Sequence, residues 1–156
     1  LEVCDDLGKH KGLRQLGLDP WSKKLTAGIL KLKFDARKIP IKTALLDQKI
    51  IAGLGNIYAS EILFDAGINP MIPANKLSKG KLSAIIQSMR KILSLALKYN
   101  GTSISDYRRV DEKQGMFQNF LKVYGKADQK CLNCSSKIEK IVQNQRSTFL
   151  CPLCQK

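Results

Sequence analysis

Two C-x-x-C pairs near the end of the chain constrain its fold more than any other feature. Cys131 and Cys134 form the first pair, Cys151 and Cys154 form the second, and 16 residues lie between the pairs. Each pair can present two thiolates from one tight turn, and four thiolates close a tetrahedral shell around zinc without an open position. The spacing therefore predicts one structural Zn2+ ion with no catalytic role. Disulfides or a redox pair are the alternatives, which the lack of a secretory signal disfavours, and Cys4 is expected to be an ordinary thiol.

The segment between the two cysteine pairs has the pattern of a β-hairpin. Residues 137–142 and 147–150 alternate or pack as two short strands, and residues 143–146 join them. This arrangement places Arg146 near the tip of the hairpin. Because an isolated hairpin is marginally stable in water, we expect the metal to hold it rigid.

Upstream of Gly101 the apolar residues recur at helical spacing. Ser22 is a candidate N-cap for a helix that reaches Leu32, and Pro40 suits the first turn of a short helix over 41–47. Asn56 is a candidate N-cap for a helix over 57–66 that Gly67 stops. The clearest helix begins at Ser78, continues through 97 and ends before Gly101. The predicted fold class is mainly α, with a zinc-bound hairpin at the end.

The charge of the chain indicates a polyanionic partner. Its 156 residues include 27 Lys and Arg against 13 Asp and Glu, so that the formal net charge is +14. The densest basic stretch, residues 23–49, is either a solvated helix face or a surface for phosphates. No apolar run approaches the roughly 20 residues of a membrane helix, and we expect no membrane partner. Aromatic residues make up only 6% of the chain, which disfavours the base stacking typical of RNA readers.

Two further segments allow more than one interpretation. Residues 102–118 are polar and lack a strong period, and a loop of this length is usually functional or disordered. The turn Gly53-Leu54-Gly55 before Asn56 can bring backbone N–H groups close to a phosphate at a helix N-terminus. Taken without other information, the same four residues are better explained by an ordinary helix cap.

The chain resembles the formamidopyrimidine-DNA glycosylase/endonuclease VIII family over essentially its whole length. The matching motifs are residues 41–48, 53–61, 69–70, 101–103 and 121–126, and the finger from Cys131 to Cys154 with 145–149 inside it. The resemblance implies the carboxy-terminal half of such a protein: an interdomain linker at 1–21, a helix–two-turn–helix DNA-binding domain at 22–124 and a zinc finger at 125–156. Residues 102–118 then correspond to a loop that closes over an everted purine in some members.

The resemblance also implies a function and a set of site residues. The parent would be a base-excision-repair glycosylase that removes oxidised purines, such as 8-oxoguanine and formamidopyrimidines, and nicks the abasic site by β,δ-elimination. Its partner is damaged double-stranded DNA, and we expect a monomer in the bacterial cytoplasm, associated with the nucleoid. The DNA-binding positions carried over are Arg37, Lys42, Gly55, Asn56 and Arg146. Arg146 also matches the finger arginine to which the second elimination is assigned, a catalytic role.

The catalytic amine of the family has no counterpart in this sequence. Family members attack with an amino-terminal proline, assisted by a neighbouring Glu and a Lys on a β-sandwich domain. We interpret the chain, which starts Leu1-Glu2-Val3, as truncated and expect it to be inactive alone. The alternatives are a stand-alone DNA- or RNA-binding zinc module and the oxidised-pyrimidine (endonuclease VIII) branch. Residues 113–117 depart from the common loop pattern, whereas 121–125 look more like the formamidopyrimidine branch.

Overall fold

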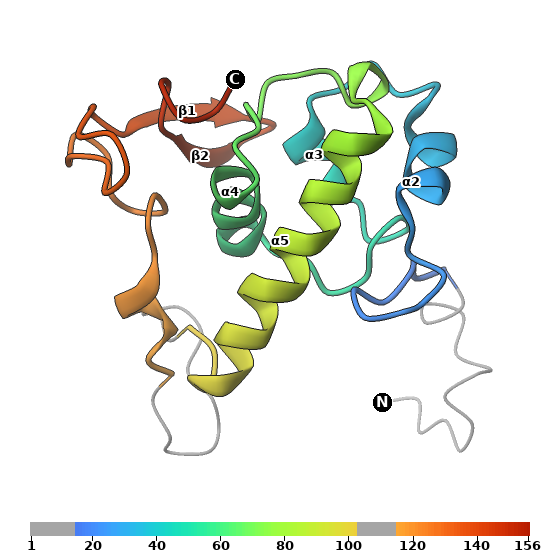
Figure 1. The fold of residues 1–156 in the computed structure, drawn as a ribbon, viewed down its shortest axis with the longest axis horizontal. Coiled ribbons are helices and arrows are strands. Elements are labelled where there is room, and N and C mark those ends of the chain that lie inside the picture. Colours follow the sequence, from blue (N-terminus) through green and yellow to red (C-terminus); the bar gives the residue numbers. More distant parts are fainter. Residues whose placement is uncertain (1–14, 103–114) are drawn as a thin grey trace.

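The computed structural model describes residues 15–102 and 115–156, and in this part of the chain a group of helices precedes a two-stranded hairpin (Figure 1). The α-helices are α2 (Ala27–Phe34), α3 (Ile41–Leu45), α4 (Asn56–Asp65) and α5 (Lys79–Lys98). Two 3-10 turns, η2 (Ala74–Lys76) and η3 (Phe117–Phe120), connect them, and the strands are β1 (Glu139–Gln143) and β2 (Arg146–Leu150). The predicted order, helices first and a hairpin finger last, is confirmed.

Helix α5 is the longest element and has the boundaries that the sequence predicts. Ser78 is its N-cap, and its hydroxyl accepts a hydrogen bond from Lys81 N at 3.3 Å. At the other end Gly101 has a φ of 78°, and its N–H donates to Ala96 O at 2.8 Å. This is a left-handed residue after a helix, where glycine carries no steric cost. The buried face of α5 packs against both α2 and α4.

Helix α2 is shorter than the sequence suggests. The expected start at Ser22 is wrong, because α2 begins at Ala27 and its N-cap is Thr26, whose hydroxyl accepts from Ile29 N. Ser22 instead closes a turn, accepting from Lys24 N. The buried residues of α2 are Leu30 and Phe34. Leu32, in contrast, is 72% exposed, so the apolar residues of this segment do not all face the core.

Helix α4 begins differently from the prediction and ends as predicted. Its N-cap is Gly55, and Asn56 is the first helical residue, with no side-chain cap hydrogen bond. The expectation that Asn56 caps the helix is therefore wrong, because its side chain is used elsewhere. The helix gives way at Gly67, which has a φ of 66°. Pro40 precedes α3 as expected, although α3 ends at Leu45.

The described part of the expected linker, residues 15–21, is attached to the helices. Gly17 N donates to Gln48 O at 2.7 Å, and Leu18 pairs with Ile51 in a parallel bridge. A Cβ at Gly17 would lie 2.3 Å from the carbonyl carbon of Ile50, so only glycine permits this approach. Residues 1–14 lie outside the described residues.

Two groups of buried apolar residues hold the molecule together. The larger one lies among the helices and includes Phe34, Leu63 and Met89. The smaller one lies under the finger and includes Phe64, Ile138 and Phe149 with two of the cysteines. Because Phe64 belongs to α4, this helix contributes to both cores and positions the finger against the helical part.

Most of the segment that the sequence predicts to be a long loop, residues 103–114, lies outside the described residues. Its two ends are joined: Thr102 pairs with Met116, and Phe117 N donates to Gly101 O at 3.0 Å. Among the helices that the structure describes, none has the length and apolar character needed to cross a membrane.

Candidate zinc centre and nucleic-acid interface

The four predicted zinc ligands lie together. The sulfur atoms of Cys131, Cys134, Cys151 and Cys154 are all within 4.8 Å of one another, and none forms a disulfide. Two of the distances are 3.4 Å, between Cys134 and Cys151, and 3.9 Å, between Cys131 and Cys154. A tetrahedral zinc with Zn–S bonds of about 2.3 Å requires sulfurs about 3.8 Å apart. The donor set therefore fits one structural zinc ion and leaves no open position.

The surroundings favour the thiolate form that zinc requires at Cys151, whereas the hydrogen bond with Cys134, followed by burial, raises the pKa of Cys154. Burial opposes ionisation, but hydrogen bonds from the Ser136 hydroxyl and from the N–H groups of Cys154 and Leu153 outweigh it, so the pKa of Cys151 falls to about 6. The turn that carries Cys151 and Cys154 is also attached to the segment that follows α4. Gln155, which is 1% exposed, accepts from Cys151 N at 2.8 Å and donates to Ile68 O at 2.9 Å.

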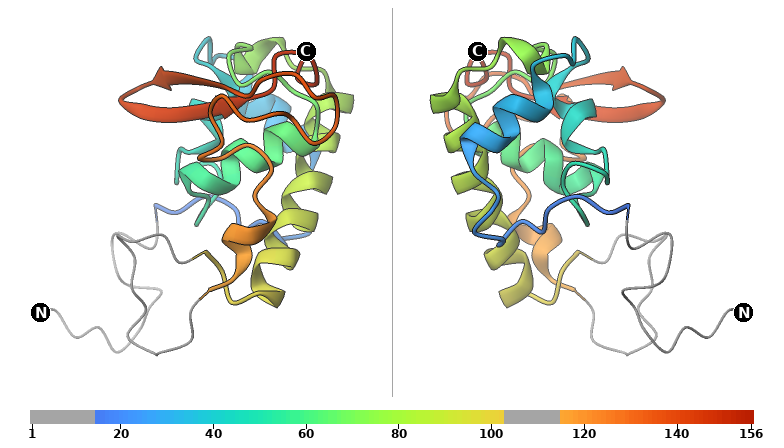
Figure 2. Two further views of the ribbon diagram at one scale, coloured as in Figure 1. Left: turned by 90° about the vertical axis from the view of Figure 1, so that its left-hand side faces the viewer. Right: turned by 90° about the vertical axis from the view of Figure 1, so that its right-hand side faces the viewer.

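The hairpin carries Arg146 at its free end, as the sequence predicts. The strands pair in antiparallel register from Glu139 with Leu150 to Gln143 with Arg146. Asn144 and Gln145 form the turn, with φ values of 45° and 60°. Figure 2 shows the hairpin projecting beyond the helices. Arg146 is exposed and has no ion pair within the described residues, so its guanidinium is available to an anion.

Lys42 lies beneath the hairpin and is 1% exposed. Its Nζ donates to Ser147 O at 2.9 Å and to Thr148 Oγ1 at 2.7 Å. Thr148 in turn donates to Gln143 Oε1 at 2.8 Å. Burial, followed by repulsion from Arg146, lowers the pKa of Lys42 from 10.5 to about 8. In this structure the Lys42 ammonium therefore joins α3 to β2, and its contact with DNA stays a prediction.

Asn56 also reaches the hairpin. Its Nδ2 donates to Ser147 O at 3.0 Å and to Tyr124 OH at 3.3 Å. Its Oδ1 is buried and has no hydrogen-bond partner in the described part of the chain. Asn56 and Lys42 thus hold the same carbonyl, that of the residue next to Arg146. Three of the predicted site residues, Lys42, Asn56 and Arg146, therefore lie close together near the tip of the hairpin.

The remaining predicted positions border this region less directly. Arg37 pairs with Asp47 at 2.9 Å, and 37% of its side chain is exposed. Asp47, together with Lys42, Arg146 and the hairpin turn, lines a cavity of about 190 Å³ between α3 and the hairpin, which we name the hairpin–α3 cleft. Gly55 lies on the exposed turn before α4, with no atom within 4 Å of where a Cβ would be. A side chain at this position would therefore meet open space.

Sequence reasoning missed the role of Glu61. This carboxylate is 1% exposed and accepts from the N–H groups of Lys122, Val123 and Tyr124, each at 2.9 Å. The contact fixes the chain entering the finger and holds Tyr124 beside Asn56. The sequence offers one signal, a glutamate placed among the apolar residues of α4. This signal does not decide between a position at the edge of the core and one on the surface of the helix.

Comparison with known proteins identifies the family. Residues 16–108 match the family described as "Formamidopyrimidine-DNA glycosylase H2TH domain", and residues 128–156 match "Zinc finger found in FPG and IleRS". The chain belongs to the formamidopyrimidine-DNA glycosylase family. The chain is 40% identical over 155 residues to the formamidopyrimidine-DNA glycosylase of Marinomonas sp. (strain MWYL1). This match covers 99% of this chain and 57% of the relative. The protein of Carboxydothermus hydrogenoformans is 45% identical over 142 residues, covering 91% and 54%.

Solved structures agree with this assignment. The MutM (Fpg) protein of Thermus thermophilus superimposes with a TM-score of 0.88 at 34% identity, covering 97% of this chain and 57% of that one. A complex of Lactococcus lactis Fpg with DNA containing an abasic site gives a TM-score of 0.82 at 35% identity, covering 92% and 52%. The chain thus spans little more than half the length of these formamidopyrimidine-DNA glycosylases, and its four clustered cysteines lie within the residues that match the zinc-finger family.

Proposed function

We propose that the chain is the DNA-binding part of a base-excision-repair glycosylase and abasic-site lyase that acts on oxidised purines. The observation that carries this proposal is the guanidinium of Arg146, free at the hairpin tip while Lys42 and Asn56 hold the adjacent carbonyl. A rigid, permanently charged fork is suited to a phosphate. Relatives named formamidopyrimidine-DNA glycosylase, and a related protein solved with abasic-site DNA, support the choice of ligand.

Each predicted residue takes a definite part in this proposal. Arg146 binds the phosphate beside the lesion and assists the second elimination through its charge. The backbone N–H groups of Gly55 and Asn56, at the start of α4, bind a neighbouring phosphate, and Arg37 adds a charge at the edge of the cleft. Lys42 supports Arg146 from below and adds positive potential. None of these contacts reads a base, so affinity depends on backbone charge.

The chemistry at the sugar needs an amine and an acid that an upstream domain of the parent would supply. The proposed lesions are 8-oxoguanine and formamidopyrimidines, and the working unit is a monomer on chromosomal DNA in the bacterial cytoplasm. No specific observation favours the RNA-binding module or the oxidised-pyrimidine branch, and the relatives reported above all carry the formamidopyrimidine name.

Binding to a labelled duplex with a central abasic-site analogue tests the proposal. We expect weak binding whose logarithm falls linearly with the logarithm of salt concentration, with a slope of about 0.9 per phosphate contact. An undamaged duplex of equal length is the control for lesion preference. Affinity that stays flat between low and high salt would refute the electrostatic interface.

A further inference from the structure

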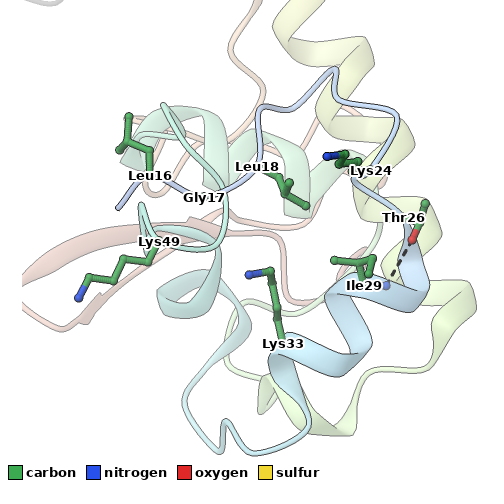
Figure 3. A pocket seen from close by; sticks show the side chains of 8 residues that line it. All are labelled: Leu16, Gly17, Leu18, Lys24, Thr26, Ile29, Lys33 and Lys49. Atoms are coloured by element: carbon green, nitrogen blue, oxygen red, sulfur yellow. Dashed lines mark hydrogen bonds between the residues drawn. The ribbon is translucent and has the colours of Figure 1, made fainter. Parts of the chain in front are cut away.

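A second basic hollow lies beside the hairpin–α3 cleft. It has a volume of about 540 Å³ and is lined by Leu16, Gly17, Leu18, Lys24, Thr26, Ile29, Lys33 and Lys49. Figure 3 shows its three lysines coming from three segments: the turn before α2, α2 itself and the loop after α3. None of the described acidic residues lines it. The lysines therefore concentrate positive charge that no described side chain of the hollow neutralises.

The basic residues near this hollow differ in whether an acidic side chain pairs with them. Lys31 pairs with Asp35 at 3.1 Å and Arg37 pairs with Asp47. Lys24, Lys33 and Lys49 are exposed, and among the described residues none of them has an ion-pair partner. Three like charges around one hollow repel one another, and an anion bound among them would relieve that repulsion.

The hollow and the hairpin–α3 cleft adjoin the same turn after α3. Asp47 lines the cleft and accepts from the N–H of Lys49 at 3.0 Å, while its other oxygen pairs with Arg37. Lys49 lines the hollow on the other side of the same turn. Arg146 at the cleft and the three lysines at the hollow therefore lie on either side of this turn, where the charges of Arg37 and Asp47 compensate each other. An extended polyanion can contact both sides.

The form of the hollow favours an extended ligand over a small one. Sites for small molecules usually bury most of the ligand in an enclosed cavity. Here the apolar lining residues Leu16 and Ile29 remain 46% and 38% exposed, which indicates a broad, open depression. Lysines act as point charges with mobile stems, suited to a phosphate backbone whose position varies.

We propose that Lys24, Lys33 and Lys49 form a second contact for the DNA backbone, on the duplex flanking the part held at the hairpin–α3 cleft. This inference rests on the proposed function. It assigns to the chain a longer footprint on DNA than the hairpin tip and α4 provide alone. It also gives a role to cations that the binding of the lesion itself does not use.

The test compares two triple variants with the same change of net charge. The first is Lys24→Gln, Lys33→Gln and Lys49→Gln, and the second, as control, is Lys79→Gln, Lys130→Gln and Lys137→Gln, which are exposed residues outside both hollows. Each is titrated at several salt concentrations with duplexes of about one and about two helical turns, roughly 10 and 20 base pairs. Thermal melting confirms that both variants fold.

On the longer duplex the first variant should lower the log–log salt slope by about 2.7, three contacts at 0.9 each, and on the shorter duplex it should match the control. Equal slopes for the two variants on the longer duplex would overturn the proposal. So would an equal loss at both lengths, because it would place the lysines within the primary contact. If the unmodified chain bound neither duplex in a salt-dependent way, the proposed function itself would fail.

Discussion

The Lys42 ammonium of α3 lies 2.7 Å from Thr148 Oγ1 of β2, a contact between residues that are 106 positions apart in the sequence. It joins the helical part to the finger next to the residue that we assign to phosphate binding. The contact is made by a buried cation whose surroundings disfavour its charge. The attachment of the finger to the helical part is therefore sensitive to pH and to substitution of Lys42.

Lys42→Gln should reduce thermal stability and remove a pH dependence. Burial and Arg146 lower the pKa of Lys42 to about 8, whereas the unfolded chain has the ordinary value of 10.5. Between these values the unfolded state binds more protons, so stability contributed by this residue rises with pH through that window. Below pH 8 the amine is protonated in both states, and the dependence vanishes. Chemical unfolding of the zinc-loaded protein at several pH values measures this pH dependence of the free energy of unfolding.

The matched control for this experiment is Lys38→Gln, because Lys38 is an exposed lysine close to α3. Subtracting the stability of the unmodified protein from that of each variant, at every pH, removes the contribution of titratable groups that all three proteins share. If Lys42→Gln kept the full rise in stability above pH 8, the buried amine would not be its source.

Arg146→Ala should weaken DNA binding without destabilising the fold. The side chain is exposed and bonds to no described residue, so its removal leaves no buried group unpaired. The log–log salt slope should fall by about 0.9 for the lost phosphate contact. In a full-length parent, the variant should impair the second elimination more than formation of the Schiff base, because its charge acts on phosphate. An unchanged salt slope would remove Arg146 from the interface.

Removing zinc should unfold the finger and leave the helices folded. The protein should contain one equivalent of zinc, and chelation should abolish the small core around Phe149 while the larger core has its own apolar residues. Trp21, the one tryptophan of the sequence, lies in the helical part and reports on it separately. Its fluorescence should persist while far-UV circular dichroism loses the strand contribution. Cys4→Ser should keep the metal, and Cys131→Ser should lose it.

Glu61→Gln should destabilise the protein by about 1.5–3 kcal/mol, the range for hydrogen bonds to a buried charged group. The carboxylate accepts three backbone N–H groups, and an amide replaces one of its acceptor oxygens with a donor. Glu139→Gln, on the exposed start of β1, is the control and should have little effect. Equal melting temperatures for the two variants would contradict the anchoring role of Glu61.

The features predictable from the sequence are those that local chemistry determines. The cysteine spacing gave the ligand set, the alternation between the pairs gave the hairpin with Arg146 at its tip, and Ser78 with Gly101 gave the ends of α5. Each depends on residues within a few positions of one another, or on one metal that joins two turns.

The features that sequence reasoning missed depend on partners far along the chain. Ser22 and Thr26 are both hydroxyl residues able to cap a helix, and the burial of Leu30 and Phe34 against other elements decides between them. Asn56 meets a carbonyl 91 positions away, which no local pattern encodes. The buried state of Lys42 and Glu61 likewise follows from how the finger packs on α3 and α4.

The 156 residues of this chain should bind DNA but not excise a base from it. Removal of a base needs a nucleophilic amine at C1′ and an acid for the leaving group, and no residue in this sequence matches either family role. The 156 residues alone should therefore form no borohydride-trappable adduct with DNA containing 8-oxoguanine. Exposed lysines can cleave a preformed abasic site slowly without a dedicated pocket, so a chain with Arg146→Ala sets that background. Adding an upstream domain that carries the amino-terminal proline should restore both steps. Saturable excision of 8-oxoguanine by these residues alone would overturn the assignment of the chemistry to that domain, whereas DNA binding without excision is the outcome that the interface at Arg146 predicts.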